Sequence, residues 1–416
     1  MSGIKLETEK FALGKSISLP NSLARKFFFK FAEKLRFGEL HIIEDGERHI
    51  FGEKTDLCAE IKIHSKDVYA DLILGGSLAA GESYMKGDWD SDDLSQFISL
   101  FARNMELVNS MDGGLAKIAS PILRGAHWLN RNTRSGSKKN IEAHYDLGND
   151  FFKTFLDETM MYSAAIFPNE QATLHEGQLN KLKTICERLE LSADDHLLEI
   201  GTGWGALAIY AAENYACQVT TTTLSKEQFS LATERIKQKN LQDKITVVLK
   251  DYRDLEGTYD KLVSVEMVEA VGHEYLPDYF RSCSHLLKPN GLFLMQVITI
   301  PDQRYERARK DIDFIKRYIF PGSCIPSVER IMSCVSKETD MRLLDHRDYT
   351  KDYSKTLKMW HQNLLHQQQR VIDLTSQEFL RMWRFYFSYC EGGFQEFAIG
   401  SAQMVFAKPH NRTQLK

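Results

Sequence analysis

The order of apolar and polar positions divides the chain into two regions of different character. Over residues 190–300, apolar strand-like runs beginning at 196, 217, 245 and 259 alternate with helical segments. This alternation predicts a parallel sheet covered by helices on both faces, and therefore an α/β fold. The last hundred residues have a helical pattern and close with a strand-like segment at 402–409.

Residues 1–113 have a shorter and more mixed pattern, with a helix predicted at 21–37 and strands over 40–64. They predict a smaller mixed α+β domain. Between the two regions, residues 114–141 hold six basic side chains and no acidic one, which is typical of a basic linker. The second domain is then expected to span residues 142–410.

The segment 21–37 has the spacing of an amphipathic helix. Apolar residues four positions apart share one face and lysines share another: Leu23, Phe27, Phe31 and Leu35 against Lys26, Lys30 and Lys34. Such a helix can lie on an anionic lipid surface, or it can bury its phenylalanines within its own domain. Periodicity alone favours the packed helix.

Composition narrows the class of protein. The 416 residues include 53 basic and 57 acidic side chains, so the net charge of −4 excludes a protein held to nucleic acid by bulk charge. Seven scattered cysteines without a C-x-x-C pair argue against a disulfide scaffold or a zinc site and favour a reducing compartment. We see no signal peptide and no run long enough to span a bilayer, so a cytoplasmic protein is expected, with no metal.

The strongest local motif is HLLEIGTGWGALAIYAAENYA at 196–216. An apolar strand runs into Gly201, Gly203 and Gly205, and an apolar helix follows. Glycines let the backbone approach a ligand closely, and the helix N-terminus presents free N–H groups. The G-x-G-x-G spacing, with Glu199 two positions ahead, is more typical of S-adenosylmethionine sites than of dinucleotide sites, which remain an alternative.

The following strands add polar side chains at the carboxyl edge of the predicted sheet, where open α/β sheets bind ligands. Gln228 replaces the acid that a dinucleotide ribose would require. Asp251, Tyr252 and Arg253 end the third strand and suit hydrogen bonding and stacking at an adenine. The fourth strand ends with two acids, Glu266 and Glu269, in an otherwise apolar run.

Taken together, these motifs resemble the cyclopropane-fatty-acid synthases and their mycolic-acid-modifying relatives. The resemblance covers nearly the whole chain and is carried by HYDLGNDFFKTFLDETMMYSAAIF (144–167), LLEIGTGWG (197–205), TLSKEQ (223–228), DYRDL (251–255), VEAVG (268–272), KRYIFPG (316–322), YCEGGF (389–394) and ESYMKGDWD (82–90). It implies a Rossmann-like class I S-adenosylmethionine-dependent methyltransferase domain, behind a smaller N-terminal lipid-binding domain.

The resemblance also implies site residues. S-adenosylmethionine would contact the YS pair, the glycine loop and the strand ends: Tyr162, Ser163, Gly201, Gly203, Gly205, Leu224, Gln228, Asp251, Tyr252 and Arg253. In the family a bicarbonate ion beside the methyl group acts as the base, and its holders match Ala164, Glu269, Gln296, Ile298 and Tyr318. Two of these depart from the family pattern, since Ala164 stands for a cysteine and Gln296 for a histidine. Glu269, Tyr318 and Cys390 are the implied catalytic residues, with Cys390 either a nucleophile or part of the acyl pocket.

The implied reaction is transfer of a methyl(ene) group from S-adenosylmethionine to the cis double bond of acyl chains in membrane phospholipids, which forms a cyclopropane fatty acid. A methyl- or methylene-branched product from the same carbocation is an alternative. A small-molecule N-methyltransferase and a non-catalytic lipid- or cofactor-binding protein are further alternatives. The implied setting is the inner face of a membrane, peripherally bound, with a phospholipid bilayer as partner, no nucleic acid, and a homodimer as a further expectation.

Overall fold

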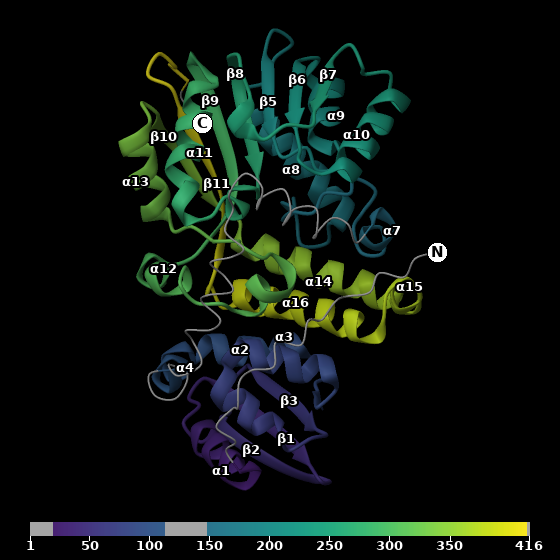
Figure 1. Cartoon of the computed structure of the whole chain (residues 1–416), viewed down its shortest axis with the longest axis vertical. Helices are drawn as coiled ribbons and strands as arrows, with labels where there is room; N and C mark the ends of the chain where they lie inside the picture. The colour runs from purple at the N-terminus through teal and green to yellow at the C-terminus, as the bar shows by residue number, and fades with distance from the viewer. Residues whose placement is uncertain (1–19, 113–147, 414–416) are drawn as a thin grey trace. The chain divides into compact units, whose positions relative to one another are not determined.

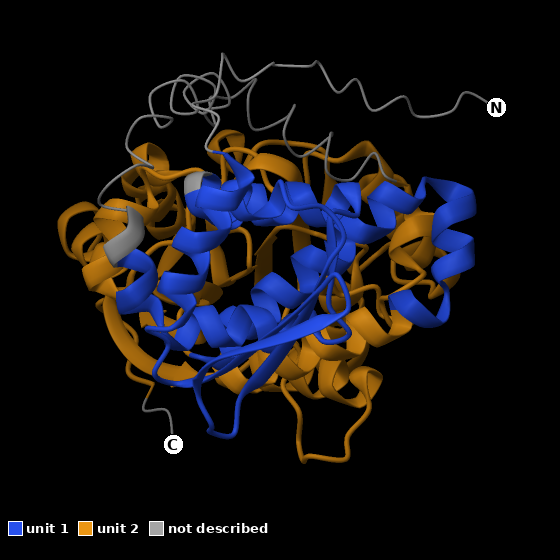
Figure 2. Cartoon of the chain, turned by 90° about the horizontal axis from the view of Figure 1, so that it is seen from below, with its two compact units in different colours: residues 1–123, 364–396 blue, residues 124–363, 397–416 orange. Residues whose placement is uncertain are grey.

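The computed structural model describes residues 20–112 and 148–413. Contacts group the chain into two compact units, one formed by residues 1–123 with 364–396 and the other by residues 124–363 with 397–416 (Figure 2). The predicted basic linker, 114–141, lies outside the described residues.

Unit 1 has a four-stranded sheet in the order β2-β1-β3-β4. Strand β1 runs antiparallel to β2 and parallel to β3, and β4 is antiparallel to β3. The predicted mixture of helices and strands is therefore confirmed (Figure 1). Its elements are α1 (Asn21–Ala32), β1 (Gly38–Glu44), β2 (Glu47–Glu53), β3 (Cys58–Ile63), α2 (Val68–Lys86), β4 (Trp89–Asp90), α3 (Leu94–Arg103), α4 (Met105–Asp112), α15 (Gln368–Leu374) and α16 (Gln377–Gln395).

Helix α1 is shorter than predicted and divides its apolar residues differently. It ends at Ala32 because the chain turns toward β1, and the Asn104 side chain accepts the N–H groups of Arg36 and Phe37 in that turn. Phe31 is buried as part of the core, whereas Phe27 stays 50% exposed. The helix thus buries part of its apolar surface in the core of unit 1 and exposes another part to solvent.

The contact grouping differs from the predicted domain boundaries in one segment. Residues 364–396 were expected in the second domain, but α16 packs against α2 and α3 of unit 1. Ser95 Oγ donates to Glu391 Oε2 at 2.7 Å, and Arg103 pairs with Glu396 at 2.8 Å. The first of these contacts joins residues 296 positions apart, so no local pattern could indicate it.

Unit 2 has a seven-stranded sheet in the order β10-β11-β9-β8-β5-β6-β7. Strands β9, β8, β5, β6 and β7 are parallel, and β11 and β10 add antiparallel pairings at one side. The strands are β5 (His196–Ile200), β6 (Gln218–Thr222), β7 (Ile245–Val248), β8 (Tyr259–Val265), β9 (Leu287–Thr299), β10 (Arg342–Asp348) and β11 (Gly400–Ala407). The predicted α/β class is confirmed, and strand order reverses between β5 and β8, where such sheets bind ligands.

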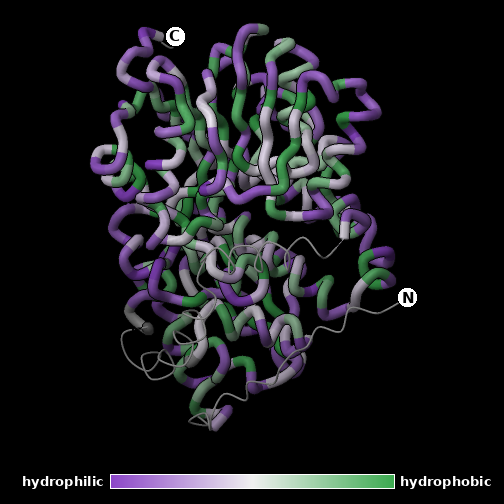
Figure 3. Tube along the Cα trace, turned by 45° about the horizontal axis from the view of Figure 1, so that its top comes forward, coloured by the Kyte–Doolittle hydropathy of each residue, from purple (hydrophilic) through white to green (hydrophobic). Residues whose placement is uncertain are grey.

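Alternate residues of these strands enter two separate cores. Leu197 and Val263 pack with α8 and α9 on one face, and Leu198 and Leu262 pack with α11 and α13 on the other. Figure 3 shows the hydrophobic stretches along these strands and the hydrophilic loops outside them. The helices are α7 (Asn149–Phe152), α8 (Leu174–Arg188), α9 (Ala206–Tyr215), α10 (Lys226–Gln238), α11 (Leu276–His285), α12 (Asp302–Ala308), α13 (Val328–Glu338) and α14 (Thr350–His366).

We expect Thr173→Ala to destabilise the protein through α8. Thr173 and Glu176 form a capping box in which each side chain bonds the other residue's backbone N–H. Loss of the threonine hydroxyl should lower the free energy of unfolding by about 1 kcal/mol. Chemical denaturation of the wild type, Thr173→Ala and the control Thr173→Ser measures this, and equal midpoints for all three would contradict it.

Candidate functional site

The loop between β5 and α9 has the backbone of a ligand cradle. Gly201, Gly203 and Gly205 all have positive φ, at 104°, 51° and 88°, which side chains with a Cβ rarely adopt. A Cβ at Gly203 would meet nothing within 4 Å, so the loop is open at that point. The amides of Gly201 and Thr202 both donate to the carbonyl of Thr222 at 3.0 Å, which fixes the loop to β6.

Glu199, the acid ahead of the glycines, is buried at the end of β5. Its Oε2 lies 2.6 Å from the Thr221 hydroxyl, which in turn lies 2.7 Å from Thr202 Oγ1. Burial raises the pKa of Glu199 to about 8. Through Thr221, this carboxyl group therefore helps to hold Thr202 of the glycine loop in place.

The remaining predicted cofactor residues surround the ends of β6 and β7. Leu224 lies half-buried in the turn before α10, and the buried Gln228 accepts a hydrogen bond from the Thr223 hydroxyl at 2.8 Å. Arg253 makes a two-pronged ion pair with Asp251, at 2.8 and 2.6 Å. The guanidinium charge is thus compensated next to Tyr252, whose ring centre lies 5.6 Å away.

An aromatic cluster brings the YS pair close to the glycine loop. The Tyr162 ring lies 5.5 Å from Phe152, 5.8 Å from Phe155 and 5.3 Å from Trp360. Phe152 also lies 5.0 Å from Trp204, which belongs to the loop itself. Rings at this spacing exclude water and offer π faces to a cation.

A buried cation supports the backbone next to Tyr162. Lys181 of α8 is fully buried and donates to Ser163 Oγ at 2.6 Å. Burial lowers the pKa of Lys181 to about 7, although the charges of Glu266 and Asp157 act in the opposite direction. Ser163 therefore faces this amine, and its contact with the cofactor stays a prediction.

Glu266 lies just after β8 and receives three hydrogen bonds from three different elements. Its Oε1 accepts the Ala164 N–H at 2.9 Å and the Gln296 side-chain N–H at 2.9 Å. Its Oε2 accepts the hydroxyl of Tyr353, on α14, at 2.6 Å. Burial raises the pKa of Glu266, while Lys181 and these donors oppose the shift.

Glu269 lies one turn further on, in the 3₁₀ helix η3 (Val268–Ala270). Its Oε1 accepts the Ile298 N–H at 2.5 Å, and its buried Oε2 has no partner among the residues that the structure describes. Burial and the nearby charge of Glu266 raise the pKa of Glu269 to about 8. Two carboxyl groups thus meet at the carboxyl edge of the sheet.

Four of the five residues predicted for the base site lie around the two carboxyl groups. Glu269 contacts Ile298, and Gln296 donates to the Ala164 carbonyl at 3.1 Å as well as to Glu266. Tyr318 lies in the π-helical segment η5 (Ile315–Ile319), where its ring centre is 5.1 Å from that of Phe314, and its place in the base site stays a prediction. The hydroxyl of Tyr353, which was not predicted for this site, contacts the Glu266 carboxyl group.

Cys390 lies half-buried on α16, in unit 1, and its assigned role stays a prediction. Sequence reasoning did not identify Tyr353 or Lys181, and it noted Glu266 without assigning it a role. Tyr353 is 87 positions from Glu266 and carries no local motif, so only the fold reveals it. Two acids at one strand end were the available signal for Glu266.

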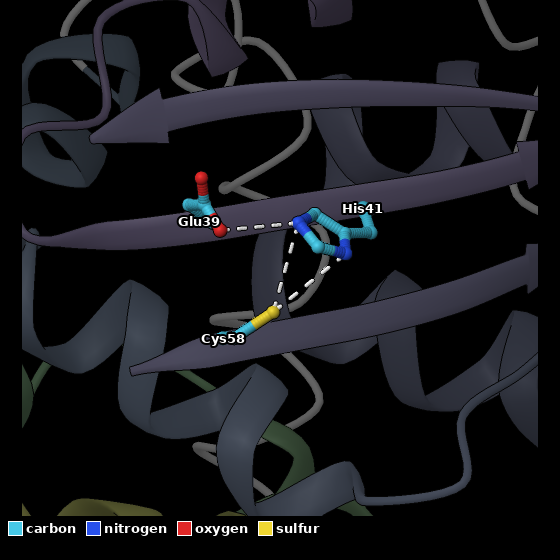
Figure 4. A group of neighbouring side chains, drawn as sticks. All are labelled: Glu39, His41 and Cys58. Atoms are coloured by element: carbon cyan, nitrogen blue, oxygen red, sulfur yellow. Dashed lines mark hydrogen bonds and ion pairs between the residues drawn. The ribbon is translucent and has the colours of Figure 1, made fainter. Parts of the chain in front are cut away.

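A second group of polar side chains lies in unit 1. Glu39, His41 and Cys58 offer ligand atoms within 4.8 Å of one another (Figure 4). The Arg48 guanidinium, however, lies 2.6 Å from His41 Nδ1, and burial raises the pKa of the Cys58 thiol. A nearby cation and a disfavoured thiolate both oppose metal binding, so we assign this group no role.

The chain is similar to proteins of known family. The model of the family "Mycolic acid cyclopropane synthetase" matches residues 132–404. The chain is 35% identical over 342 residues to the tuberculostearic acid methyltransferase UfaA1 of Mycobacterium tuberculosis, covering 80% of this chain and 79% of the relative. It is also 35% identical over 353 residues to the cyclopropane-fatty-acyl-phospholipid synthase of Escherichia coli, covering 84% of this chain and 88% of that relative.

Solved structures give the same result for the fold. The mycolic acid cyclopropane synthase CmaA1, solved with SAH and CTAB, has a TM-score of 0.62 and 30% identity, covering 65% of this chain and 98% of that one. Coclaurine N-methyltransferase has a TM-score of 0.57 at 20% identity, covering 78% and 97%, which shows the fold alone. The predicted Rossmann-like methyltransferase fold is confirmed.

Proposed function

Because the chain belongs to the mycolic acid cyclopropane synthetase family and is an S-adenosylmethionine-dependent methyltransferase, we propose that it modifies cis double bonds in the acyl chains of membrane phospholipids. Relatives named as cyclopropane synthases and fatty acid methyltransferases support an acyl substrate. The observation that carries the proposal is the pair of buried carboxyl groups, Glu266 and Glu269, at the strand ends beside the open glycine loop.

The chemistry requires an environment for a positive charge. S-adenosylmethionine supplies a methyl group on a positively charged sulfur, which a weak nucleophile such as an alkene can attack. The attack leaves a carbocation on the acyl chain, and water must be kept from it. Glu266, which accepts three hydrogen bonds, supplies negative charge, and Glu269 adds a second charge as the pH rises through about 8. The aromatic cluster around Tyr162 supplies apolar walls and π faces.

The product depends on which proton leaves the carbocation. We propose a cyclopropane, formed by loss of a proton from the transferred methyl group. Loss from a neighbouring carbon gives a methyl-branched chain, and the equal identity to UfaA1 and to the E. coli synthase supports both products alike. An N-methyltransferase finds support only in fold-level likeness at 20% identity.

A labelled methyl group tests the reaction and the product together. The protein is incubated with trideuteriomethyl S-adenosylmethionine and dioleoylphosphatidylglycerol vesicles, and the released fatty acids are analysed by mass spectrometry. We expect one added carbon that has lost one deuterium, as ring closure requires, and no alkene carbons at this position in carbon-13 NMR, since a methylene branch also loses one deuterium. Retention of all deuterium would indicate a methyl branch, and unlabelled lipid would contradict acyl methylation and direct the search to amine acceptors.

The ionisation of Glu269 should affect binding of a sulfonium but not of a neutral thioether. With a pKa raised to about 8, Glu269 gains its charge as the pH rises through that value. We expect the affinity ratio of S-adenosylmethionine to S-adenosylhomocysteine to rise several-fold from pH 7 to pH 9. The ratio isolates the sulfur charge because both ligands share the same amino acid group.

Calorimetric titration of the wild type and Glu269→Gln measures this ratio. The glutamine variant should show a smaller change of the ratio with pH, and part of the change remains because Lys181, with a pKa of about 7, still titrates. If the ratio changes equally with pH in both proteins, Glu269 does not face the sulfur.

We further propose that the protein binds peripherally to the inner, cytoplasmic face of a membrane, and that unit 1 carries the surface that contacts the lipid. The structure has no described helix long and apolar enough to cross a bilayer. Leu23 and Phe27 of α1 are 41% and 50% exposed, and the lysines of the same helix region, Lys26, Lys30 and Lys34, are exposed as well. Exposed apolar residues among lysines suit an anionic lipid surface.

Charge reversal tests this surface. We expect Lys26→Glu, Lys30→Glu and Lys34→Glu together to weaken sedimentation with phosphatidylglycerol vesicles and to leave binding of S-adenosylhomocysteine unchanged. The control reverses three exposed lysines of unit 2, Lys183, Lys237 and Lys239. Equal vesicle binding by both variants would indicate that α1 only packs within unit 1 and does not contact lipid.

A further inference from the structure

The residues predicted to hold bicarbonate do not offer it a free set of donors. The Ala164 N–H and the Gln296 side chain, two of the predicted holders, both donate to Glu266 Oε1. A further donor, the hydroxyl of Tyr353, bonds Glu266 Oε2. A protein carboxylate therefore occupies the donors that an added anion would need.

We propose, on the basis of the function above, that the Glu266 carboxylate takes the place of bicarbonate as the resident anion and proton acceptor of the reaction. A carboxylate and a bicarbonate share a planar pair of oxygens with one delocalised charge. Glu266 receives three donors and donates to none of them, which is the pattern of an ionised carboxylate.

The orientation of Gln296 supports this arrangement. Arg188 has only donors, and it donates to Gln403 Oε1 at 2.7 Å and to Asp345 at 2.7 Å. Gln403 must then turn its NH₂ group to Gln296 Oε1, at 3.0 Å. This leaves the Gln296 NH₂ group to face Glu266, so Arg188 fixes Gln296 as a donor to an anion.

The backbone and the nearby charge also serve this carboxylate. Glu266 has a φ of 48°, a left-handed conformation that costs a residue with a side chain on the order of 1 kcal/mol. The fully buried Lys181 interacts electrostatically with Glu266. Glu266 thus combines a left-handed backbone, three hydrogen bonds and a nearby buried lysine, an arrangement that an incidental surface acid does not have.

The proposed step is balanced without a further reactant. The S–CH₃ bond breaks with its electron pair remaining on sulfur, and the alkene π electrons form the first new C–C bond. A C–H bond of the transferred methyl group then breaks, and its electron pair closes the ring at the carbocation. The proton passes to a Glu266 oxygen and is lost to solvent after the product leaves.

Two variants separate a resident anion from an added one. Glu266→Gln keeps the volume but removes the charge. Glu266→Gly suits the positive φ and leaves the three donors facing the space that the carboxylate filled. The matched control is Glu256→Gln, an exposed acid of the same domain. Each protein is assayed for methyl transfer to lipid in carbonate-depleted buffer, with and without added sodium bicarbonate.

We expect bicarbonate to change wild-type and Glu256→Gln activity by less than about twofold, and both Glu266 variants to lose about 100-fold. Added bicarbonate should restore the methyl-transfer activity of Glu266→Gly, where it can fill the vacated space, but not that of Glu266→Gln, where the amide fills it. Carbon-13 NMR of labelled bicarbonate should show binding to Glu266→Gly and none to the wild type, and all variants should bind S-adenosylhomocysteine alike.

Wild-type activity that falls in depleted buffer and returns with bicarbonate would overturn the inference, as would full activity of Glu266→Gln. Neither result would touch the proposed function, because labelled lipid would still form. Absence of labelled lipid with the wild type under every condition would instead contradict the function itself.

Discussion

Two carboxyl groups are buried at the carboxyl end of β8, and the segments that surround them in unit 2 must supply hydrogen-bond donors and positive charge. A carboxylate removed from water costs several kcal/mol unless donors and a counter-charge replace its hydration. Glu266 and Glu269 therefore receive donors from the Ala164 backbone, the end of β9 and α14, and Glu266 interacts with the buried Lys181 of α8. Segments that are far apart in the sequence, such as Ala164 and Tyr353, must therefore lie beside Glu266 to offset the free-energy cost of its burial.

This constraint also explains the parts of the site that make no contact with the carboxylates. The network from Asp345 through Arg188 and Gln403 fixes one amide, Gln296, in a single orientation. The 163–167 backbone is held against α14, where Ala165 donates to Thr356 at 3.0 Å and Phe167 donates to Asp352 at 2.9 Å. Such a rigid polar edge beside an open glycine loop suits a reaction that develops positive charge away from water.

The sequence predicted the features that depend on local pattern and not those that depend on long-range packing. The parallel strands and the glycine loop follow from apolar runs and glycine spacing, and both are present. Strand β10 was missed because it is a polar edge strand in which no residue is fully buried. The site's donors from α8 and α14 were missed because Lys181 and Tyr353 lie in ordinary helical patterns, and the assignment of α16 to unit 1 rests on contacts nearly 300 positions apart.

The central claim is that the two carboxyl groups face the reacting sulfur of the cofactor. A crystal structure of the protein with S-adenosylhomocysteine measures this directly. The account predicts the amino acid end of the ligand at Gly201–Gly205, the adenine beside Tyr252, and the sulfur directed toward Glu266 and Glu269. A ligand whose sulfur points away from both carboxyl groups, or whose binding leaves the glycine loop empty, would contradict it.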